Sequence, residues 1–493
     1  MTAGKQVVRN SLFGIVSQAI GGGLFFLVTL LVARHLNPER FGAFSFVFAF
    51  VTVFQMLADF GLSNILIREM SRQRQRISEI LGAVIPLVSV LAVLGYAVIA
   101  LSSEFLKLTP EAKQAVYIMG ATVLVTFHAT VYAAVCRAHE EMGFNAAGLI
   151  AQRLALLILI LAALYLDAGL PGIALCYLGE RLFQWLFFYF LVRVRYTRYR
   201  WRLDTAYWRY LMREGLPVGA GMVLRRISWY VDTFMLMALS TVGSVGLFSA
   251  AYRVIQMVNV VPFTLSVPLF PMLSRLAVES HEKVFSLYNR AQKIFVLLGL
   301  PSGLWIVMLG PRLMVLLFGK GYEAAGITLR IMGVVAVLLF MNSLFVYLFS
   351  ALGKQKSYMT SIAISLLINL LLDLLFIPIW DIEGAAVATL CSELALYTSG
   401  ILLLARSGQV TALLQLLLKP AIITLLAGSV LVWPLVSGTW ISLILGTVAF
   451  VGLFLGLVLG LRLITRDELL TLRAALPGRG RVRNTANQVD GKS

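Results

Sequence analysis

Long apolar runs dominate this sequence and decide what the chain can fold into. A helix that crosses the hydrocarbon core of a bilayer needs about 20 apolar residues, and runs of that length recur from end to end between charged or Gly-, Pro- and Asn-containing breaks. They lie at about 11–33, 43–67, 80–101, 115–136, 148–166, 170–192, 216–239, 247–272, 294–318, 326–350, 358–379, 385–405, 420–437 and 440–464. The pattern predicts an all-α polytopic membrane protein with about fourteen transmembrane helices.

Composition excludes a water-soluble enzyme. Apolar residues make up 60% of the chain and charged residues 13%, whereas soluble chains have about 45–50% and about 25%. The net charge of +18 would suggest nucleic-acid binding in a soluble protein. In a membrane protein, however, basic residues collect in cytoplasmic loops, so we expect no nucleic-acid partner.

The distribution of Lys and Arg predicts the orientation. Alternate connections, beginning with the N-terminus, hold 29 basic residues, and the other set of connections holds 6. The set with the excess is expected in the cytoplasm. An even number of spans returns the chain to its starting side, so both termini are expected to be cytoplasmic.

Short motifs recur at a nearly constant spacing. FGAFS at 41–45 is echoed by VGLFS at 245–249, and YIMG at 117–120 by RIMG at 330–333. The triplet Asp167, Gly172 and Glu180 is echoed in the same order by Asp381, Gly384 and Glu393. Because six helices return the chain to its starting side, the repeat predicts two six-helix lobes that run in the same sense, which is a transporter architecture.

The repeat divides the chain into five regions. We expect an N-terminal lobe over 1–192, a linker over 193–215, a C-terminal lobe over 216–405, two further helices over 406–464, and a basic, disordered tail over 465–493. The linker carries seven Arg among Tyr and Trp residues, which suits an amphipathic helix on the membrane surface. It either fixes topology through its charge or contacts anionic lipid headgroups.

Motifs of catalysis are missing from the sequence. There is no GxxxxGK[ST] loop for ATP, the four His show no metal-ligand spacing, and the three Cys lie in apolar runs. No connection on the external side is long enough for a catalytic domain. We therefore expect a protein that is not an enzyme and that binds no cofactor.

Arginines inside the predicted helices are candidates for anion binding. A charged side chain at the bilayer centre costs about 2.5–3.5 kcal/mol on insertion scales, so it tends to face a cavity or a partner. Guanidinium groups suit phosphate or pyrophosphate. Arg225 and Arg226 could instead pair with Glu180, and Arg153 could extend to water at its helix end. The four candidates are Arg153, Arg181, Arg225 and Arg226.

Acids inside the predicted helices are candidates for ion coupling. Asp232 and Arg253 are expected at matching depth in a helical hairpin, so a mutual ion pair is their simplest explanation. Any of the other buried acids could carry a proton or bind Na⁺ in a cycle driven by an H⁺ or Na⁺ gradient. These are Asp59, Glu180, Asp373 and Glu393.

Three segments resemble a known family. GGGLFFLVTLLVARHLNPERFGAFSFVF within 21–72, VDTFMLMALSTVGSVGLFSAAYRVIQ within 231–277, and ALGKQKS at 351–357 are similar to Wzx-type polysaccharide exporters of the multidrug/oligosaccharidyl-lipid/polysaccharide (MOP) superfamily. The resemblance implies two lobes in a V, two extra C-terminal helices and an ion-driven alternating-access cycle. It also implies a bacterial inner-membrane flippase for polyprenyl-pyrophosphate-linked oligosaccharide in surface polysaccharide biosynthesis, such as O-antigen or exopolysaccharide.

The resemblance further implies sites and partners. Family members are thought to bind the pyrophosphate through cavity arginines, for which Arg153, Arg181, Arg225 and Arg226 are the available positions. The expected partners are the lipid-linked oligosaccharide, membrane lipids, and a polysaccharide polymerase with chain-length proteins.

Two other functions remain open. The same fold would serve an ion-coupled antiporter of drugs or metabolites, although a cationic drug would favour a cavity dominated by acids. A membrane-embedded glycan polymerase or ligase fits the composition, but it would be expected to carry a large external loop.

Overall fold

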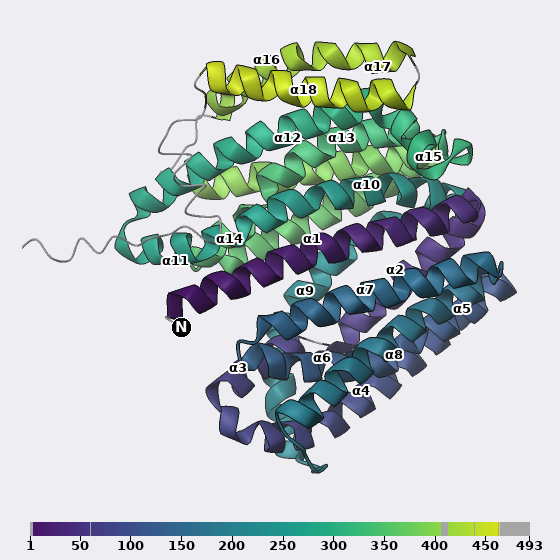
Figure 1. Cartoon of the computed structure of the whole chain (residues 1–493), viewed down its shortest axis with the longest axis vertical. Helices are drawn as coiled ribbons and strands as arrows, with labels where there is room; N and C mark the ends of the chain where they lie inside the picture. Colours follow the sequence, from purple (N-terminus) through teal and green to yellow (C-terminus); the bar gives the residue numbers. More distant parts are fainter. Residues whose placement is uncertain (1–2, 60, 406–412, 438, 462, 464–493) are drawn as a thin grey trace, which may run out of the picture.

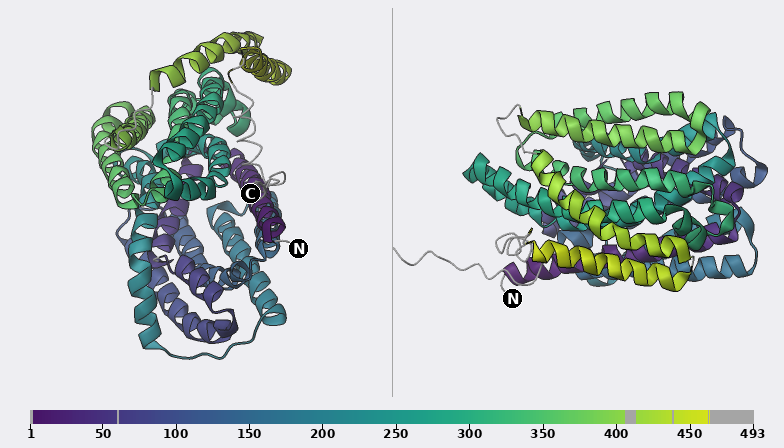
Figure 2. Two further views of the ribbon diagram at one scale, coloured as in Figure 1. Left: turned by 90° about the vertical axis from the view of Figure 1, so that its left-hand side faces the viewer. Right: turned by 90° about the horizontal axis from the view of Figure 1, so that it is seen from above.

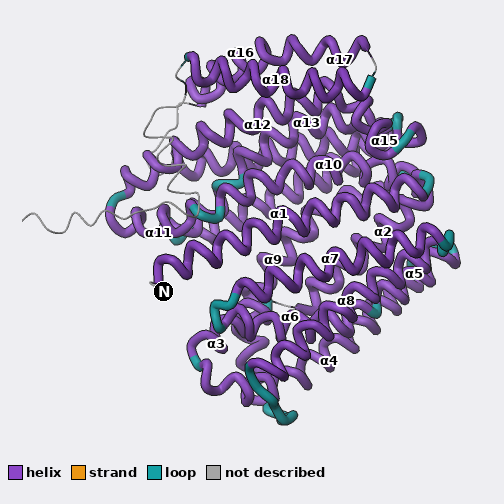
Figure 3. Tube along the Cα trace, in the orientation of Figure 1, coloured by secondary structure: helices purple, strands orange, loops and turns teal. Residues whose placement is uncertain are grey.

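The computed structural model describes residues 3–59, 61–405, 413–437, 439–461 and 463. Within them the regular structure is helical throughout (Figure 3). In these described residues, ten helical segments are long and apolar enough to cross a membrane, and some of the other helices are shorter. The all-α, multi-pass fold class is confirmed. The count of fourteen spans stays a prediction, and the tail over 465–493 lies outside the described residues.

The N-terminal lobe is formed by the helices that precede residue 196. Thr109 and Pro110 show how the sequence starts one of them: the Thr109 side chain accepts a hydrogen bond from the Ala112 amide at 3.3 Å, and Pro110 occupies the first turn. The elements are α1 (Ala3–His35), α2 (Pro38–Asp59), α3 (Leu62–Arg72), η1 (Arg74–Arg76), α4 (Ile77–Glu104), α5 (Pro110–Gly120), α6 (Thr122–Ala138), α7 (Met142–Tyr165) and α8 (Gly169–Arg195).

The C-terminal lobe follows. Its elements are α9 (Thr205–Leu239), α10 (Val242–Ser266), α11 (Leu269–Glu279), α12 (His281–Phe318), η2 (Lys320–Tyr322), α13 (Ala325–Asn342), α14 (Phe345–Ala351) and α15 (Gln355–Ala405). The long α15 turns back on itself at Asp381, where φ is 49°. The chain then adds α16 (Leu413–Gly428), η3 (Ser429–Leu431), α17 (Val432–Ser437) and α18 (Trp440–Gly460).

The two lobes form separate groups of helices that α1 and α9 connect. In Figure 1 the N-terminal lobe lies below and the C-terminal lobe above, with α1 between them. Helix α1 packs along α7 and also contacts α10 and α12, while α9 contacts α3 and α4 at one side and α15 at the other. Figure 2 shows from two further sides that α1 begins and α18 ends at the same end of the bundle.

The connection between the lobes is helical at both ends, in α8 up to Arg195 and in α9 from Thr205, and only its middle part differs from the expected helix. Residues 196–204 are not helical, and they lie against α4, where the Arg202 amide donates to the Gly82 carbonyl at 3.0 Å. The cause is Pro86, which lacks an N–H and so leaves the carbonyl four residues earlier without its helical partner. The absence of a side chain at Gly82 also allows the backbone of this segment to approach α4, because a Cβ there would lie 2.3 Å from the Arg200 carbonyl oxygen.

The internal repeat is visible in three dimensions where α2 meets α10. A Cβ on Gly42 would lie 1.8 Å from the Val242 carbonyl oxygen, and a Cβ on Gly246 would lie 1.9 Å from the Pro38 carbonyl oxygen. The two contacts are reciprocal, because Gly246 follows Gly42 by the same repeat offset by which Val242 follows Pro38. The repeated acids agree, since Asp167 and Asp381 have φ values of 48° and 49°.

Polar contacts join the two lobes where α1 ends. The Arg34 guanidinium donates to the Leu316 and Leu317 carbonyls near the end of α12. The Tyr322 hydroxyl donates to the Ala33 carbonyl at 2.8 Å. These bonds join the end of α1 to the C-terminal lobe.

We predict that Gly42→Ala destabilises this junction. The added methyl group must push α2 away from α10, and overpacking of this kind typically costs about 1–3 kcal/mol. The midpoint of thermal unfolding of the purified protein should fall. Gly23→Ala is the matched control, because nothing lies within 4 Å of a Cβ at Gly23 on α1. Equal effects of the two substitutions would contradict the role of the junction.

Candidate functional site

Two arginines from different lobes contact the same aromatic ring. The guanidinium carbon of Arg153 on α7 lies 4.6 Å from the centroid of the Phe25 ring, and that of Arg253 on α10 lies 5.6 Å from it. Arg253 also lies 5.2 Å from the centroid of the Phe48 ring. Aromatic faces attract cations, so these rings hold two positive groups at the boundary between the lobes.

Arg153 forms an ion pair inside the N-terminal lobe. Its guanidinium donates to Glu180 on α8 at 2.8 Å, and the Gln152 amide donates to the same carboxylate oxygen at 2.6 Å. The Glu180 side chain is fully buried. The acid considered as a partner for Arg225 and Arg226 is therefore bound to Arg153, whose side chain is 18% exposed.

Arg181 and Tyr177 complete this region. Arg181 donates to Gln184 at 3.1 Å and lies within electrostatic range of Arg153. Tyr177 lies within electrostatic range of Arg153, Arg181 and Arg253. We call Arg153, Arg181 and Arg253 the arginine cluster.

Among the described residues, the arginine cluster carries more positive than negative charge. Arg153 is paired with Glu180, whereas Arg253 donates to the neutral Gln256 at 2.9 Å and Arg181 to the neutral Gln184. Only 8% of the Arg253 residue surface is exposed. Guanidinium groups held in this way are suited to bind phosphate oxygens through forked hydrogen bonds.

Arg225 and Arg226 lie elsewhere. The Arg226 guanidinium is 5.7 Å from the Trp229 ring centroid on its own helix, α9. Arg225 is exposed and acts electrostatically on Glu393 of α15, whose carboxylate accepts a hydrogen bond from Asn342 at 2.7 Å.

Asp232 does not pair with Arg253, so that interpretation was wrong. Asp232 accepts hydrogen bonds from Asn369 at 3.1 Å and from Thr389 at 3.2 Å. The reason is depth along the hairpin. Helix α10 begins at Val242, before the predicted start at 247, which places Arg253 about one helical turn deeper than its expected partner.

Two buried acids lie together in the C-terminal lobe. Asp373 is fully buried, Asp232 is 3% exposed, and the two carboxyl groups interact electrostatically. Neither carboxylate oxygen of Asp373 accepts a hydrogen bond from a donor in the part of the chain that is described. We use the name acidic pocket for this group of four neighbouring side chains, Asp232, Asp373, Asn369 and Thr389.

Buried carboxylates need a positive partner or a proton, because an unpaired buried charge is costly. The acidic pocket contains no Lys or Arg, but it offers carboxylate, amide and hydroxyl oxygens. It is therefore suited to a proton or to a small hard cation. The remaining acid candidate, Asp59, ends α2, and its side chain lies outside the described residues.

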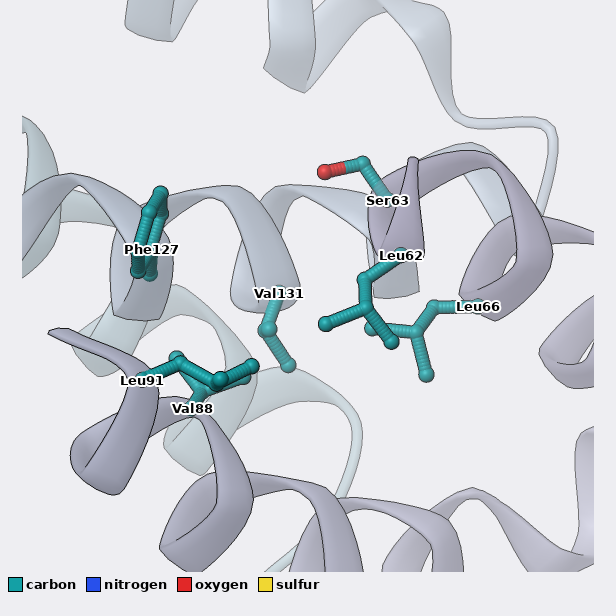
Figure 4. Close-up of a pocket in the computed structure, with 7 residues that line it drawn as sticks. All are labelled: Leu62, Ser63, Leu66, Val88, Leu91, Phe127 and Val131. Carbon is teal, nitrogen blue, oxygen red and sulfur yellow. The ribbon is translucent and has the colours of Figure 1, made fainter. Parts of the chain in front are cut away.

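A small gap between α3, α4 and α6 is not a binding site. Figure 4 shows its lining, which is apolar apart from Ser63. Its volume of about 10 Å³ is at the lower limit for one water molecule. The gap reflects imperfect packing inside the N-terminal lobe.

Comparison with known proteins identifies relatives of this chain. Residues 7–277 match the family model described as "Polysaccharide biosynthesis protein". A segment of 174 residues is 25% identical to the "Probable flippase AglR" of Haloferax volcanii, and it covers 34% of this chain and 36% of that protein. The match thus spans about a third of the length of that curated relative.

Solved structures share the fold. The lipid II flippase MurJ in its inward closed conformation aligns with a TM-score of 0.73 and 16% identity, over 92% of this chain and 100% of that chain. An inward-facing multidrug resistance MATE family transporter of the MOP superfamily aligns with a TM-score of 0.66 and 16% identity, over 83% and 100%. At this identity the likeness establishes the fold alone. The named relatives are flippases and transporters rather than enzymes.

Proposed function

Because this chain belongs to the polysaccharide biosynthesis protein family and has the fold of MOP-superfamily transporters, we propose that it flips a polyprenyl-pyrophosphate-linked oligosaccharide across the bacterial cytoplasmic membrane. It is a multi-pass, flippase-like transporter, and the proposal adds its substrate, its membrane and its mechanism. The product would supply surface polysaccharide biosynthesis, where a polymerase and chain-length proteins would be the next partners. Both termini would lie in the cytoplasm.

The arginine cluster is the observation that carries this proposal. Arg153 belongs to the N-terminal lobe and Arg253 to the C-terminal lobe, and both guanidinium groups contact Phe25. A pyrophosphate bound there would touch both lobes at once. Relative motion of the lobes would then carry the anion from one face of the membrane to the other, which is alternating access.

The chemistry of the substrate fits such a path. The hydroxyl groups of a glycan cannot be desolvated in hydrocarbon without a large cost, so they must cross between protein surfaces that supply water or hydrogen bonds. The polyprenyl tail can stay in lipid. We propose that residues 1–192 and 216–405 are the two moving units, joined by the connection over 193–215, with residues 406–464 added to the second.

The acidic pocket would couple transport to an ion gradient. A proton or Na⁺ bound by Asp232 and Asp373 would neutralise two acids that are otherwise buried together. Asp232 lies on α9, and Asp373 lies on the arm of α15 before its turn. Asp232 also accepts hydrogen bonds from Asn369 on that same arm and from Thr389 on the arm after the turn. Binding of the ion would therefore change the packing of α9, the helix that contacts both lobes.

A deletion strain tests the proposed function. Loss of this protein should abolish surface polysaccharide and trap the lipid-linked oligosaccharide in the cytoplasmic leaflet, and a plasmid copy should restore both. If the strain instead keeps its polysaccharide and becomes sensitive to cationic drugs, the antiporter interpretation would replace this one.

A further inference from the structure

A cavity at one end of the N-terminal lobe combines arginines with aromatic rings. It has a volume of about 500 Å³ and lies between α6, α8 and the non-helical segment 196–204. Its lining residues are Tyr132, Tyr189, Val192, Arg193, Thr197, Arg198, Tyr199, Arg200 and Trp201. We propose that this cavity, the linker pocket, binds the phosphate-bearing headgroup of an anionic membrane lipid.

The linker pocket is built by fixed elements. The Ser78 hydroxyl on α4 donates to the Arg198 carbonyl at 2.7 Å, and the Arg202 amide donates to Gly82 at 3.0 Å. Across the cavity the hydroxyl oxygens of Tyr132 and Tyr199 are 2.6 Å apart. These bonds hold the segment 196–204 in one shape, so a ligand would meet a preformed site.

The charges of the linker pocket are not neutralised by acids. The neighbouring Arg195 and Arg202 form ion pairs with Glu141 at 3.1 Å and with Asp204 at 3.7 Å. Among the described residues, Arg193, Arg198 and Arg200 form no ion pair with a carboxylate. Three cations that share one cavity without an acid favour an anionic ligand.

The surroundings of the linker pocket favour a lipid over a soluble anion. It lies where α8 ends, and the neighbouring face of α8 carries a row of exposed apolar side chains: Leu186, Phe190 and Val194 are 41%, 57% and 85% exposed. Residues four apart share one helix face, so the row offers a continuous surface for acyl chains. Tyr, Trp and Arg are also the residues that collect at the level of lipid headgroups.

The site is separate from the arginine cluster. None of its lining residues belongs to that cluster: Arg193 lies in the last turn of α8, and Arg198 and Arg200 follow the end of that helix. A resident lipid would brace the segment that joins the lobes, and transport would depend on anionic lipid without any change in substrate binding.

Lipid retention by the purified full-length protein tests the proposal. Native mass spectrometry would count the lipids kept after titration with phosphatidylglycerol, with phosphatidylcholine, and with phosphatidylglycerol in excess inorganic phosphate. The wild-type protein should prefer phosphatidylglycerol, and inorganic phosphate should not displace it. Arg198→Gln/Arg200→Gln should weaken lipid retention by about tenfold or more, because each basic residue near an anionic headgroup adds to the free energy of lipid binding.

Two comparisons make the result decisive. Arg209→Gln/Arg213→Gln removes the same charge from exposed positions of the same connection outside the pocket, and it should change retention by less than about twofold. Arg198→Lys/Arg200→Lys should restore most of the binding. Equal losses in both glutamine variants, no preference for phosphatidylglycerol, or displacement by inorganic phosphate would each overturn the proposal.

Discussion

Arg253→Gln should abolish export of the surface glycan while the protein stays in the membrane at its normal level. Arg253 is the residue that the C-terminal lobe contributes to the arginine cluster, and its guanidinium donates to a neutral side chain, that of Gln256. Loss of a charge-assisted bond costs about 1.5–3 kcal/mol, which corresponds to at least about a tenfold fall in transport rate. Surface polysaccharide and trapped lipid-linked oligosaccharide would be measured in a complemented deletion strain.

Two further substitutions show whether the loss of export is specific to the Arg253 guanidinium. Arg253→Lys keeps the charge but loses the forked donors, so it should restore only part of the export. Arg330→Gln is the matched control, because Arg330 on α13 is exposed and lies outside the cluster. Normal export by Arg253→Gln would remove this residue from the mechanism, and an equal loss in Arg330→Gln would point to a general effect of charge.

Asp373→Asn should uncouple transport from its driving ion. Asp373 is fully buried beside Asp232, and an amide cannot provide the negative charge that attracts a proton or cation into the acidic pocket. The rate of flipping in proteoliposomes should fall at least about tenfold and should no longer respond to the imposed gradient. Na⁺ and H⁺ gradients would be imposed separately, so that the wild-type protein identifies the ion.

Glu323→Gln serves as the control for Asp373→Asn. Glu323 is an exposed acid that follows η2, and it does not belong to the acidic pocket. It should keep both the rate and the ion dependence. An Asp373→Asn protein that responds to the gradient as the wild-type protein does would rule out this pocket as the coupling site.

The repeat was the part of the fold most accessible from sequence. The recurrence of FGAFS as VGLFS predicted two equivalent halves, and Gly42 and Gly246 do meet each other at the junction of α2 and α10. Such a motif can be recognised because a close approach of two backbones admits little besides glycine. Which helices of the two halves touch, and at which end of the bundle, depends on three-dimensional packing that a single sequence does not show.

The Arg153–Glu180 pair could have been predicted from depth. Arg153 stands twelve residues before the end of α7, and Glu180 stands eleven after the start of α8, so the two face each other across one hairpin. The same argument failed for Asp232 and Arg253 because the start of α10 was placed five residues late. An error of that size moves a side chain by more than one helical turn.

Only one side of the backbone contact that shapes the linker could be predicted from nearby sequence. Pro86 releases the carbonyl of Gly82 four residues earlier, which could be read from the sequence. The group that uses it is the amide of Arg202, more than a hundred residues away. No periodicity in 193–215 indicates that contact, so the basic and aromatic composition alone suggested a surface helix.

Reconstituted flipping of the lipid-linked glycan is the most direct measurement. Proteoliposomes would carry a fluorescent polyprenyl-pyrophosphate-linked oligosaccharide, and a membrane-impermeant reagent would report its arrival in the outer leaflet. We expect the wild-type protein to move the oligosaccharide well above the rate of protein-free vesicles and Arg253→Gln to remain near that background. A wild-type rate no faster than that of empty vesicles, or an equal rate in Arg253→Gln, would contradict a flippase that works through the arginine cluster.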